Sequence, residues 1–180
     1  MFEIKVSNLQ DSFYERAKWA TKAVGLIDPE RNSIGDKNYH IELFHDIPWP
    51  NSEMMVSPNP DHLKRIMKFT KNFTDEDKIL VHCHQGVSRS TAIAIAILIQ
   101  HGMTSKEAIN KIHEVRDCMW PNDLIIQYTD KYFKLNNELV DEVAAFKKKW
   151  NNKFIVPSSE PSQDDIDHMQ RLKDILNGRL

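Results

Sequence analysis

The segment HCHQGVSRS, residues 82–90, concentrates side chains that can do chemistry, and Cys83 is the strongest nucleophile among them. A free thiol is only ~3% ionised at pH 7, because its unperturbed pKa is about 8.5. A helix amino terminus and a nearby arginine can lower such a pKa to roughly 3.5–7.5, and Arg89 follows Cys83 by six residues. Complete ionisation would increase the concentration of the thiolate nucleophile at most about thirtyfold. Catalysis therefore also needs residues that hold an electrophile and stabilise its transition state.

The residues between Cys83 and Arg89 have the spacing of an anion-binding loop. Such a loop, wrapped before a helix, directs successive backbone N–H groups at one point and forms a cradle for a phosphate-sized anion. Arg89 offers a planar fork for two phosphate oxygens. Ser90 can donate a hydrogen bond to the sulfur and ease its departure in a second step. Gly86 is free to take a positive φ, which the wrapped loop requires. We expect the anion to be bound by six residues of the loop: His84, Gln85, Gly86, Val87, Ser88 and Arg89.

This loop resembles the signature of the cysteine-dependent protein tyrosine phosphatases: cysteine, five residues, arginine, then serine or threonine. The SRS ending and the short chain are similar to the dual-specificity branch, and the resemblance covers about residues 20–135. Gln85 departs from the commoner small residue before the glycine, which affects pocket shape more than chemistry. The resemblance implies that the thiolate attacks phosphorus, that water hydrolyses a cysteinyl-phosphate, and that no metal or other cofactor takes part.

The resemblance also implies an aspartic acid on a separate loop that protonates the leaving oxygen and later activates the water. General acid–base help of this kind contributes about 10²–10⁴ in rate. Asp46 fits best, because it ends a predicted strand and starts a proline-rich loop, thirty-seven residues before Cys83. Asp61 lies at a predicted helix start, and Asp75 and Asp77 lie in a turn, so we expect these three to be caps and solvated charges.

Four other residues have a functional and a structural interpretation. His82 either tunes the thiolate or packs at a strand end. Trp49 and Trp120 either flank a substrate ring or are buried, and burial is the safer prediction. Cys118 is expected to be a thiol without a role.

Three other classes of protein could use parts of this segment. A zinc site on His82 and His84 would need four ligands, and no second cluster is spaced to complete it. A sulfur-transfer or redox enzyme is disfavoured by the loop length and by the lack of a partner cysteine near Cys83. A module that binds phosphate without turnover would keep the loop but lack a working acid or an open pocket.

The charge of the loop bears on the substrate. Arg89 is its only permanent cation, which favours a singly phosphorylated group. Phosphotyrosine in a protein or peptide is the first expectation, and phosphoserine or phosphothreonine is the second. A phosphorylated RNA 5′ end, a phosphoinositide or a small metabolite stays open, because specificity depends on pocket depth.

Strands and helices alternate around the loop. Residue patterns predict strands at 1–8, 26–28, 39–46 and 78–83, the last buried on both faces. Helices are predicted over 11–25, 61–73, 89–102, 105–117, 122–135, 139–150 and 163–178. This order predicts an α/β fold with a central, mostly parallel sheet flanked by helices, and a helical C-terminal extension. Ligands in such sheets bind beyond the carboxyl ends of strands, where the loop falls.

Helix boundaries rest on capping residues. The first helix is expected to start at Asp11 or Ser12 and to end at Gly25. Thr104 and Glu107 form a capping-box pattern for the helix that follows them.

Composition limits the remaining possibilities. The 180 residues predict a phosphatase domain over 1–150, followed by a linker at 151–162 and a terminal helix. A net charge of −2 argues against nucleic acid as a partner, and two cysteines cannot form a disulfide framework. No secretion signal is visible, and the longest apolar run is about half a membrane span. We therefore expect a cytoplasmic monomer that acts on a phosphorylated protein or peptide and does not bind membranes.

Overall fold

The computed structural model describes residues 2–31, 33–50 and 52–154, with side chains through residue 150. Its strands are β1 Glu3–Ser7, β2 Lys22–Ile27, β3 Tyr39–Leu43 and β4 Lys78–His82. Its helices are α1 Leu9–Lys18, the short η1 Pro29–Arg31, α2 Pro60–Thr70, α3 Arg89–Gln100, α4 Ser105–Val115, α5 Asp123–Phe133 and α6 Glu138–Phe154.

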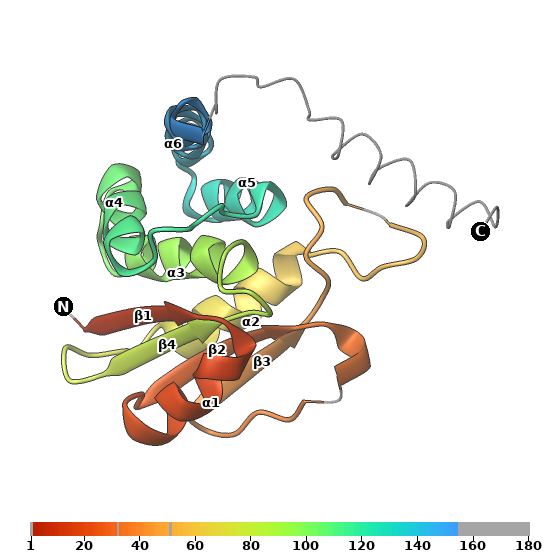
Figure 1. Cartoon of the computed structure of the whole chain (residues 1–180), viewed down its shortest axis with the longest axis vertical. Helices are drawn as coiled ribbons and strands as arrows, with labels where there is room; N and C mark the ends of the chain where they lie inside the picture. Colours follow the sequence, from red (N-terminus) through yellow and green to blue (C-terminus); the bar gives the residue numbers. More distant parts are fainter. Residues whose placement is uncertain (1, 32, 51, 155–180) are drawn as a thin grey trace, which may run out of the picture. The chain divides into compact units, whose positions relative to one another are not determined.

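The four strands form one parallel sheet in the order β1-β4-β2-β3 (Figure 1). β4 lies between β1 and β2, and its Val81 is in register with Val6 on one side and Val24 on the other. The sequence KILVH has no polar face because both faces of β4 are covered, and Ile79, Leu80 and Val81 are fully buried. The predicted α/β fold with a central parallel sheet is confirmed.

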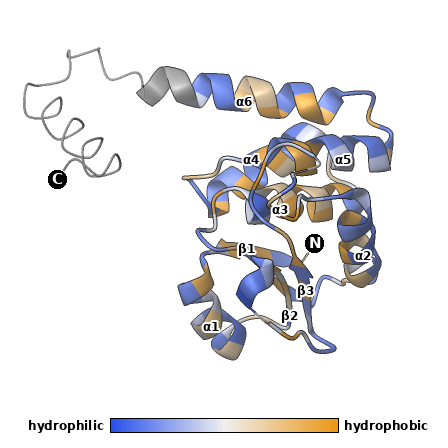
Figure 2. Cartoon of the chain, turned by 90° about the vertical axis from the view of Figure 1, so that its right-hand side faces the viewer, coloured by the Kyte–Doolittle hydropathy of each residue, from blue (hydrophilic) through white to orange (hydrophobic). Residues whose placement is uncertain are grey.

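The helices cover the two faces of the sheet unequally. α1 lies on one face, and α2, α3 and α4 lie on the other (Figure 1). α3 is buried from Arg89 to Leu98, and Figure 2 shows it as a largely hydrophobic helix. A helix that is apolar on all sides must be enclosed, and the sheet, α4 and α5 pack around it.

The prediction for residues 11–25 is wrong in its boundaries. α1 begins earlier, because the Asn8 side chain accepts a hydrogen bond from the Asp11 N–H and caps the helix. Gly25 does not end a helix but lies within β2. A Cβ at Gly25 would lie 2.6 Å from the Tyr39 hydroxyl and 2.9 Å from His82 Nε2, so the glycine permits close packing between strands.

The second half of the chain agrees better with expectation. Thr104 and Glu107 form the predicted capping box at α4. Residues 151–154, expected to begin a linker, continue α6, whereas the rest of the linker and the helix at 163–178 lie outside the described residues. The chain divides into two units after Ala145, and the domain boundary at residue 150 stays a prediction. No helix in the described residues has the length and apolarity needed to span a membrane.

Candidate active site

Cys83 lies at the carboxyl end of the central strand. It directly follows β4, and α3 begins at Arg89, so the loop between them joins the strand to the helix. Cys83 is 1% exposed. Its Sγ accepts a hydrogen bond from the Gly86 N–H at 3.2 Å and lies 3.2 Å from Ser90 Oγ. The sulfur therefore lies beside the amino end of a buried helix, where the helix dipole stabilises negative charge.

Gly86 adopts the expected left-handed conformation, with φ of 71°. A Cβ at this position would lie 2.5 Å from the Ser7 carbonyl carbon and 2.6 Å from its oxygen. Both the backbone conformation and the contact with β1 therefore require glycine. The carboxyl end of β1 packs directly against the loop.

The carbonyl groups of the loop are held by Arg116, which follows α4. Its Nη2 donates to the Gln85 carbonyl and its Nε to the Gly86 carbonyl, each at 2.9 Å. In a trans peptide the carbonyl and the following N–H point in opposite directions. Binding of the Gln85 carbonyl by Arg116 thus orients the Gly86 N–H toward Cys83 Sγ. Two more loop carbonyls accept backbone N–H groups of the next segment: Val87 from Trp120 and Ser88 from Asn122.

Arg89 is buried beneath the loop and lies between two carboxylates. Its Nη1 donates to Asp28 Oδ1 at 2.7 Å and to the Phe44 carbonyl at 2.6 Å. Its Nε is buried without a hydrogen-bond partner among the described residues, and it lies 3.8 Å from Asp46 Oδ2. An unpaired buried donor costs about 1–3 kcal/mol, so a ligand oxygen at this nitrogen would be stabilised.

Asp28 is a site residue that the sequence patterns did not indicate. It directly follows β2, which pairs with β4, and its carboxylate anchors Arg89. The available signal was a charged residue immediately after the apolar run GLI, at the carboxyl end of a strand.

Asp46 lies beside the loop, as the resemblance implies for the acid. Its Oδ1 accepts hydrogen bonds from Ser88 Oγ at 2.7 Å and from Asn122 Nδ2 at 2.9 Å. Asn122 also caps α5 through its Oδ1, so one side chain joins that helix to the Asp46 loop. Sequence patterns indicated neither contact.

The other aspartates have structural contacts. Asp61 is exposed and pairs with Lys64 at 3.0 Å, and this hydrogen bond lowers the pKa of the Asp61 carboxyl. Asp77 accepts the Thr74 N–H at 2.8 Å, and Asp75 lies in the same turn. Asn59 rather than Asp61 caps α2, so Asp61 is a surface charge and not a cap. Asp77 caps its turn, and Asp75 is exposed, as expected.

His82 packs in the interior. Its Nε2 lies 2.7 Å from the Tyr39 hydroxyl, and its ring is fully buried. Burial lowers the pKa of His82 to about 4, so the ring is neutral at neutral pH. His84 is exposed instead.

Within residues 2–31, 33–50 and 52–154 there is no group of three or more acidic, histidine or cysteine side chains that could hold a metal ion.

A cavity of about 380 Å³ opens over the loop. The loop contributes His84, Gln85, Val87, Ser88 and Arg89 to its lining, and the segments after β2 and β3 contribute Asp28, His45, Asp46, Ile47 and Met55. The cavity therefore brings together the expected acid, the guanidinium and the loop that is expected to bind an anion.

The prediction that both tryptophans are buried is wrong. Trp49 is 57% exposed and Trp120 is 39% exposed. Trp49 lies in the proline-rich loop after Asp46. The Trp120 backbone N–H donates to the Val87 carbonyl in the loop between Cys83 and Arg89. Cys118 is an exposed free thiol.

Comparison with known proteins identifies the class. The family described as dual specificity phosphatase, catalytic domain, matches residues 24–134, more than half of the chain. The chain belongs to this family, and its cysteine loop, parallel sheet and helices agree with the resemblance found in the sequence.

Individual relatives are distant. The chain is 32% identical over 84 residues to the serine/threonine/tyrosine-interacting protein of Homo sapiens, covering 43% of this chain and 38% of that protein. It is 35% identical over 63 residues to the tyrosine-protein phosphatase yvh1 of Schizosaccharomyces pombe, covering 34% and 19%. Each match spans less than half of the relative's length. The crystal structure of the human tyrosine phosphatase-like serine/threonine/tyrosine-interacting protein shares the fold, with a TM-score of 0.53, 21% identity, and coverage of 72% of this chain and 87% of that chain.

Proposed function

We propose that this protein hydrolyses phosphomonoesters through a cysteinyl-phosphate on Cys83. The observation that carries the proposal is the position of Cys83 Sγ, within 3.2 Å of both the Gly86 N–H and the Ser90 hydroxyl at the start of α3. A phosphate bound over the loop would meet backbone N–H groups and the Nε of Arg89, which has no hydrogen-bond partner among the described residues.

The first step transfers the phosphoryl group to sulfur. The Cys83 thiolate attacks phosphorus while the bond to the leaving oxygen breaks, and Asp46 gives its proton to that oxygen. The hydrogen bonds that Ser88 and Asn122 donate to Asp46, a residue that lines the cavity, support this role.

The second step regenerates the enzyme. The Asp46 carboxylate takes a proton from water, the water oxygen attacks phosphorus, and the S–P bond breaks to release inorganic phosphate. The departing thiolate accepts a hydrogen bond from Ser90, which lies 3.2 Å away.

We propose phosphotyrosine in a protein or peptide as the preferred substrate, with phosphoserine and phosphothreonine next. In the described part of the chain, Arg89 is the one cavity-lining residue with a permanent positive charge, which suits a single phosphate group. Ile47 and Met55 add apolar surface where an aromatic ring would lie. Phosphoinositides, phosphorylated RNA ends and small metabolites are alternatives that a substrate panel separates.

The decisive experiment is turnover of p-nitrophenyl phosphate in the presence of a metal chelator. The wild-type protein should turn over and, after rapid quenching with labelled substrate, carry phosphate on Cys83. Cys83→Ser should lose both signals while retaining the fold. Full activity in Cys83→Ser would refute the proposal. Asp46→Asn should lower kcat and flatten one limb of the pH profile, and if it changes neither, the acid lies elsewhere.

A phosphate-binding module without turnover is the second candidate. The near-complete burial of Cys83 and the contacts of Arg89 with Asp28 and Phe44 favour it, because both groups must become available to a substrate. Binding of a phosphotyrosine peptide without release of phosphate would establish this alternative.

A further inference from the structure

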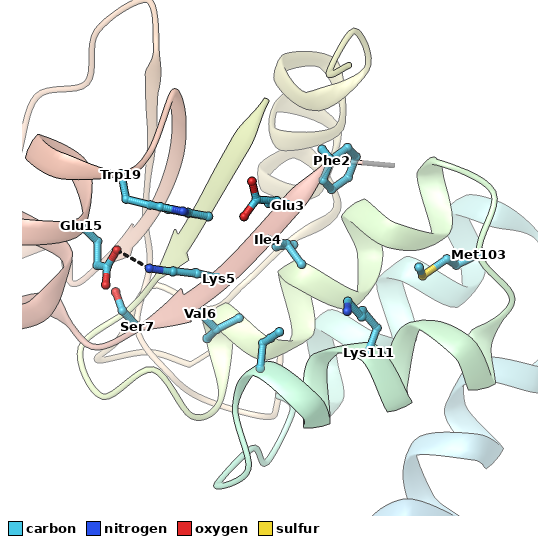
Figure 3. Close-up of a pocket in the computed structure, with 11 residues that line it drawn as sticks. Phe2, Glu3, Ile4, Lys5, Val6, Ser7, Glu15, Trp19, Met103 and Lys111 are labelled. Carbon is cyan, nitrogen blue, oxygen red and sulfur yellow. Dashed lines mark hydrogen bonds and ion pairs between the residues drawn. The ribbon is translucent and has the colours of Figure 1, made fainter. Parts of the chain in front are cut away.

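A second hollow, of about 740 Å³, lies along the outer edge of β1 (Figure 3). β1 forms its floor, and the walls come from α1 and α4: Glu15 and Trp19 on one side, Lys111 and Val115 on the other. The hollow shares no lining residue with the cavity over the cysteine loop. It is therefore a separate feature of the surface, and we call it the β1 groove.

The backbone at the floor of the β1 groove is available for pairing. β1 is an edge strand, and no strand in the described residues pairs with its outer side. The Glu3 N–H donates toward β4, to the Asp77 carbonyl at 3.2 Å. Because consecutive residues of a strand direct their polar groups to opposite sides, those of Ile4 and Val6 face the β1 groove. An exposed row of this kind is a template for another strand.

The two walls differ in chemistry. Toward α4 the lining residues Ile4, Val6, Met103 and Val115 are apolar. Lys111 lies among them on the same wall (Figure 3). Toward α1 the lining residues are Glu3, Lys5, Glu15 and Trp19 (Figure 3).

The wall on the α1 side carries more negative than positive charge. Lys5 pairs with Glu15 at 2.8 Å and lies 4.4 Å from the centre of the Trp19 ring. The Glu3 side chain is 65% exposed, and its nearest cation, Lys78 at 3.9 Å, does not line the groove. A basic side chain on this wall would therefore meet an available carboxylate.

We propose that the β1 groove binds an extended segment of a partner protein by strand addition. Apolar side chains of that segment alternate with basic ones, so that the apolar face meets α4 and the basic face meets Glu3. β1 has five residues, about 17 Å of strand, so a segment of about five residues pairs along it. Walls from helices on both sides leave room for a single strand, whereas a whole second copy would bring its own α1 and α4 against them.

Fluorescence anisotropy of the full chain with labelled peptides of about nine residues tests this proposal. The probes alternate Val or Ile with Lys or Arg, and a matched set carries Glu in place of the basic residues. The basic probes should bind, and the Glu probes should bind more weakly. Failure of all the basic probes to bind would overturn the proposal.

Backbone pairing is tested by N-methylation of every second residue of a probe that binds. Methylation of the set whose N–H groups face β1 should weaken binding by roughly tenfold or more, and methylation of the other set should not. Equal effects of the two sets would overturn strand addition.

Charge recognition is tested by Glu3→Lys. This variant should weaken binding of the basic probes about tenfold and strengthen that of the Glu probes, whereas Asp141→Lys, an equal charge change on α6 outside the groove, should alter neither. Identical behaviour of the two variants would contradict the proposed orientation. Concentration-dependent dimerisation that Glu3→Lys abolishes would instead make a second copy the occupant and overturn the proposal. None of these binding results depends on whether Cys83 is catalytic.

Discussion

The fold holds Arg89 through one nitrogen, and in the proposed function another nitrogen binds a phosphate oxygen. Nη1 binds Asp28 and the Phe44 carbonyl, which fixes the guanidinium plane. Nε lies 3.8 Å from Asp46 Oδ2 and has no hydrogen-bond partner among the described residues. A lysine has one nitrogen and cannot hold the anchor and a phosphate oxygen in the same geometry.

Arg89→Lys should therefore lower kcat/KM by about 10²–10³, the usual cost of losing one donor to a developing negative charge. Arg31→Lys, the same exchange at an exposed residue, is the control and should have no effect. Steady-state kinetics with p-nitrophenyl phosphate measures both. A change of less than about threefold in Arg89→Lys would show that the guanidinium of Arg89 does not stabilise the phosphate in the transition state.

Ser88 positions the proposed acid, because its hydroxyl donates to Asp46 Oδ1 at 2.7 Å. Ser88→Ala should lower kcat about three- to tenfold, which corresponds to the loss of one ordinary hydrogen bond of roughly 1 kcal/mol. In the Asp46→Asn background the same exchange should cost little, since the group that it positions is no longer an acid. A double-mutant cycle on kcat measures the coupling. Additive effects would show that Ser88 acts independently of Asp46.

At the scale of elements, the sequence indicated the site residues that are close to Cys83 along the chain, and it missed most of those that are far from it. The strand, loop and helix around Cys83 are contiguous, so spacing alone indicated that Cys83, Gly86 and Arg89 belong to one loop. Asp46 was found by its place after a strand. Asp28, Asn122 and Arg116 were missed because each reaches the site through tertiary packing: Asp28 lies 61 residues from Arg89, Asn122 lies 76 residues from Asp46, and Arg116 lies 30 residues from Gly86.

Arg116 links α4 to the loop through two carbonyl groups. Arg116→Ala should release those peptide planes, raise the inhibition constant of inorganic phosphate, and lower kcat/KM by about 10–100-fold. Arg116→Lys should recover part of the loss, because lysine can hold one carbonyl. Lys106→Ala, an exposed change on the same helix, is the control. An unchanged inhibition constant for phosphate in Arg116→Ala would show that Arg116 does not orient the loop.

Because Gly25 has no side chain, Tyr39 and His82 can pack closely against β2. In Gly25→Ala the new Cβ would meet the Tyr39 hydroxyl at 2.6 Å and His82 Nε2 at 2.9 Å. Overpacking of this kind should destabilise the protein by about 1–3 kcal/mol in urea unfolding. Tyr39→Phe removes the nearest atom, so the double variant should lose less than the sum of the single variants. Additive losses would show that the hydroxyl is not the obstacle.

At the scale of the whole molecule, the buried core couples stability to pH. His82 has a pKa lowered by burial to about 4, against 6.5 in an exposed state, and burial also lowers the pKa of His62. Below the unfolded pKa the unfolded chain binds a proton that the folded protein excludes. Stability is therefore complete above pH 6.5 and is lost as the pH falls toward 4.

For His82 alone this loss amounts to about 3 kcal/mol over that range, at about 1.4 kcal/mol per pKa unit. The free energy of urea unfolding, measured at intervals between neutral pH and pH 4, should fall accordingly. His82→Gln keeps a polar group near Tyr39 but cannot be protonated, so its curve should be flatter than that of the wild type, even if the variant is less stable at neutral pH. His84→Gln, at an exposed ring in the same segment, should follow the wild-type slope. Parallel curves for wild type and His82→Gln would mean that this imidazole takes up protons equally in the folded and unfolded chains, and that acid sensitivity arises elsewhere in the core.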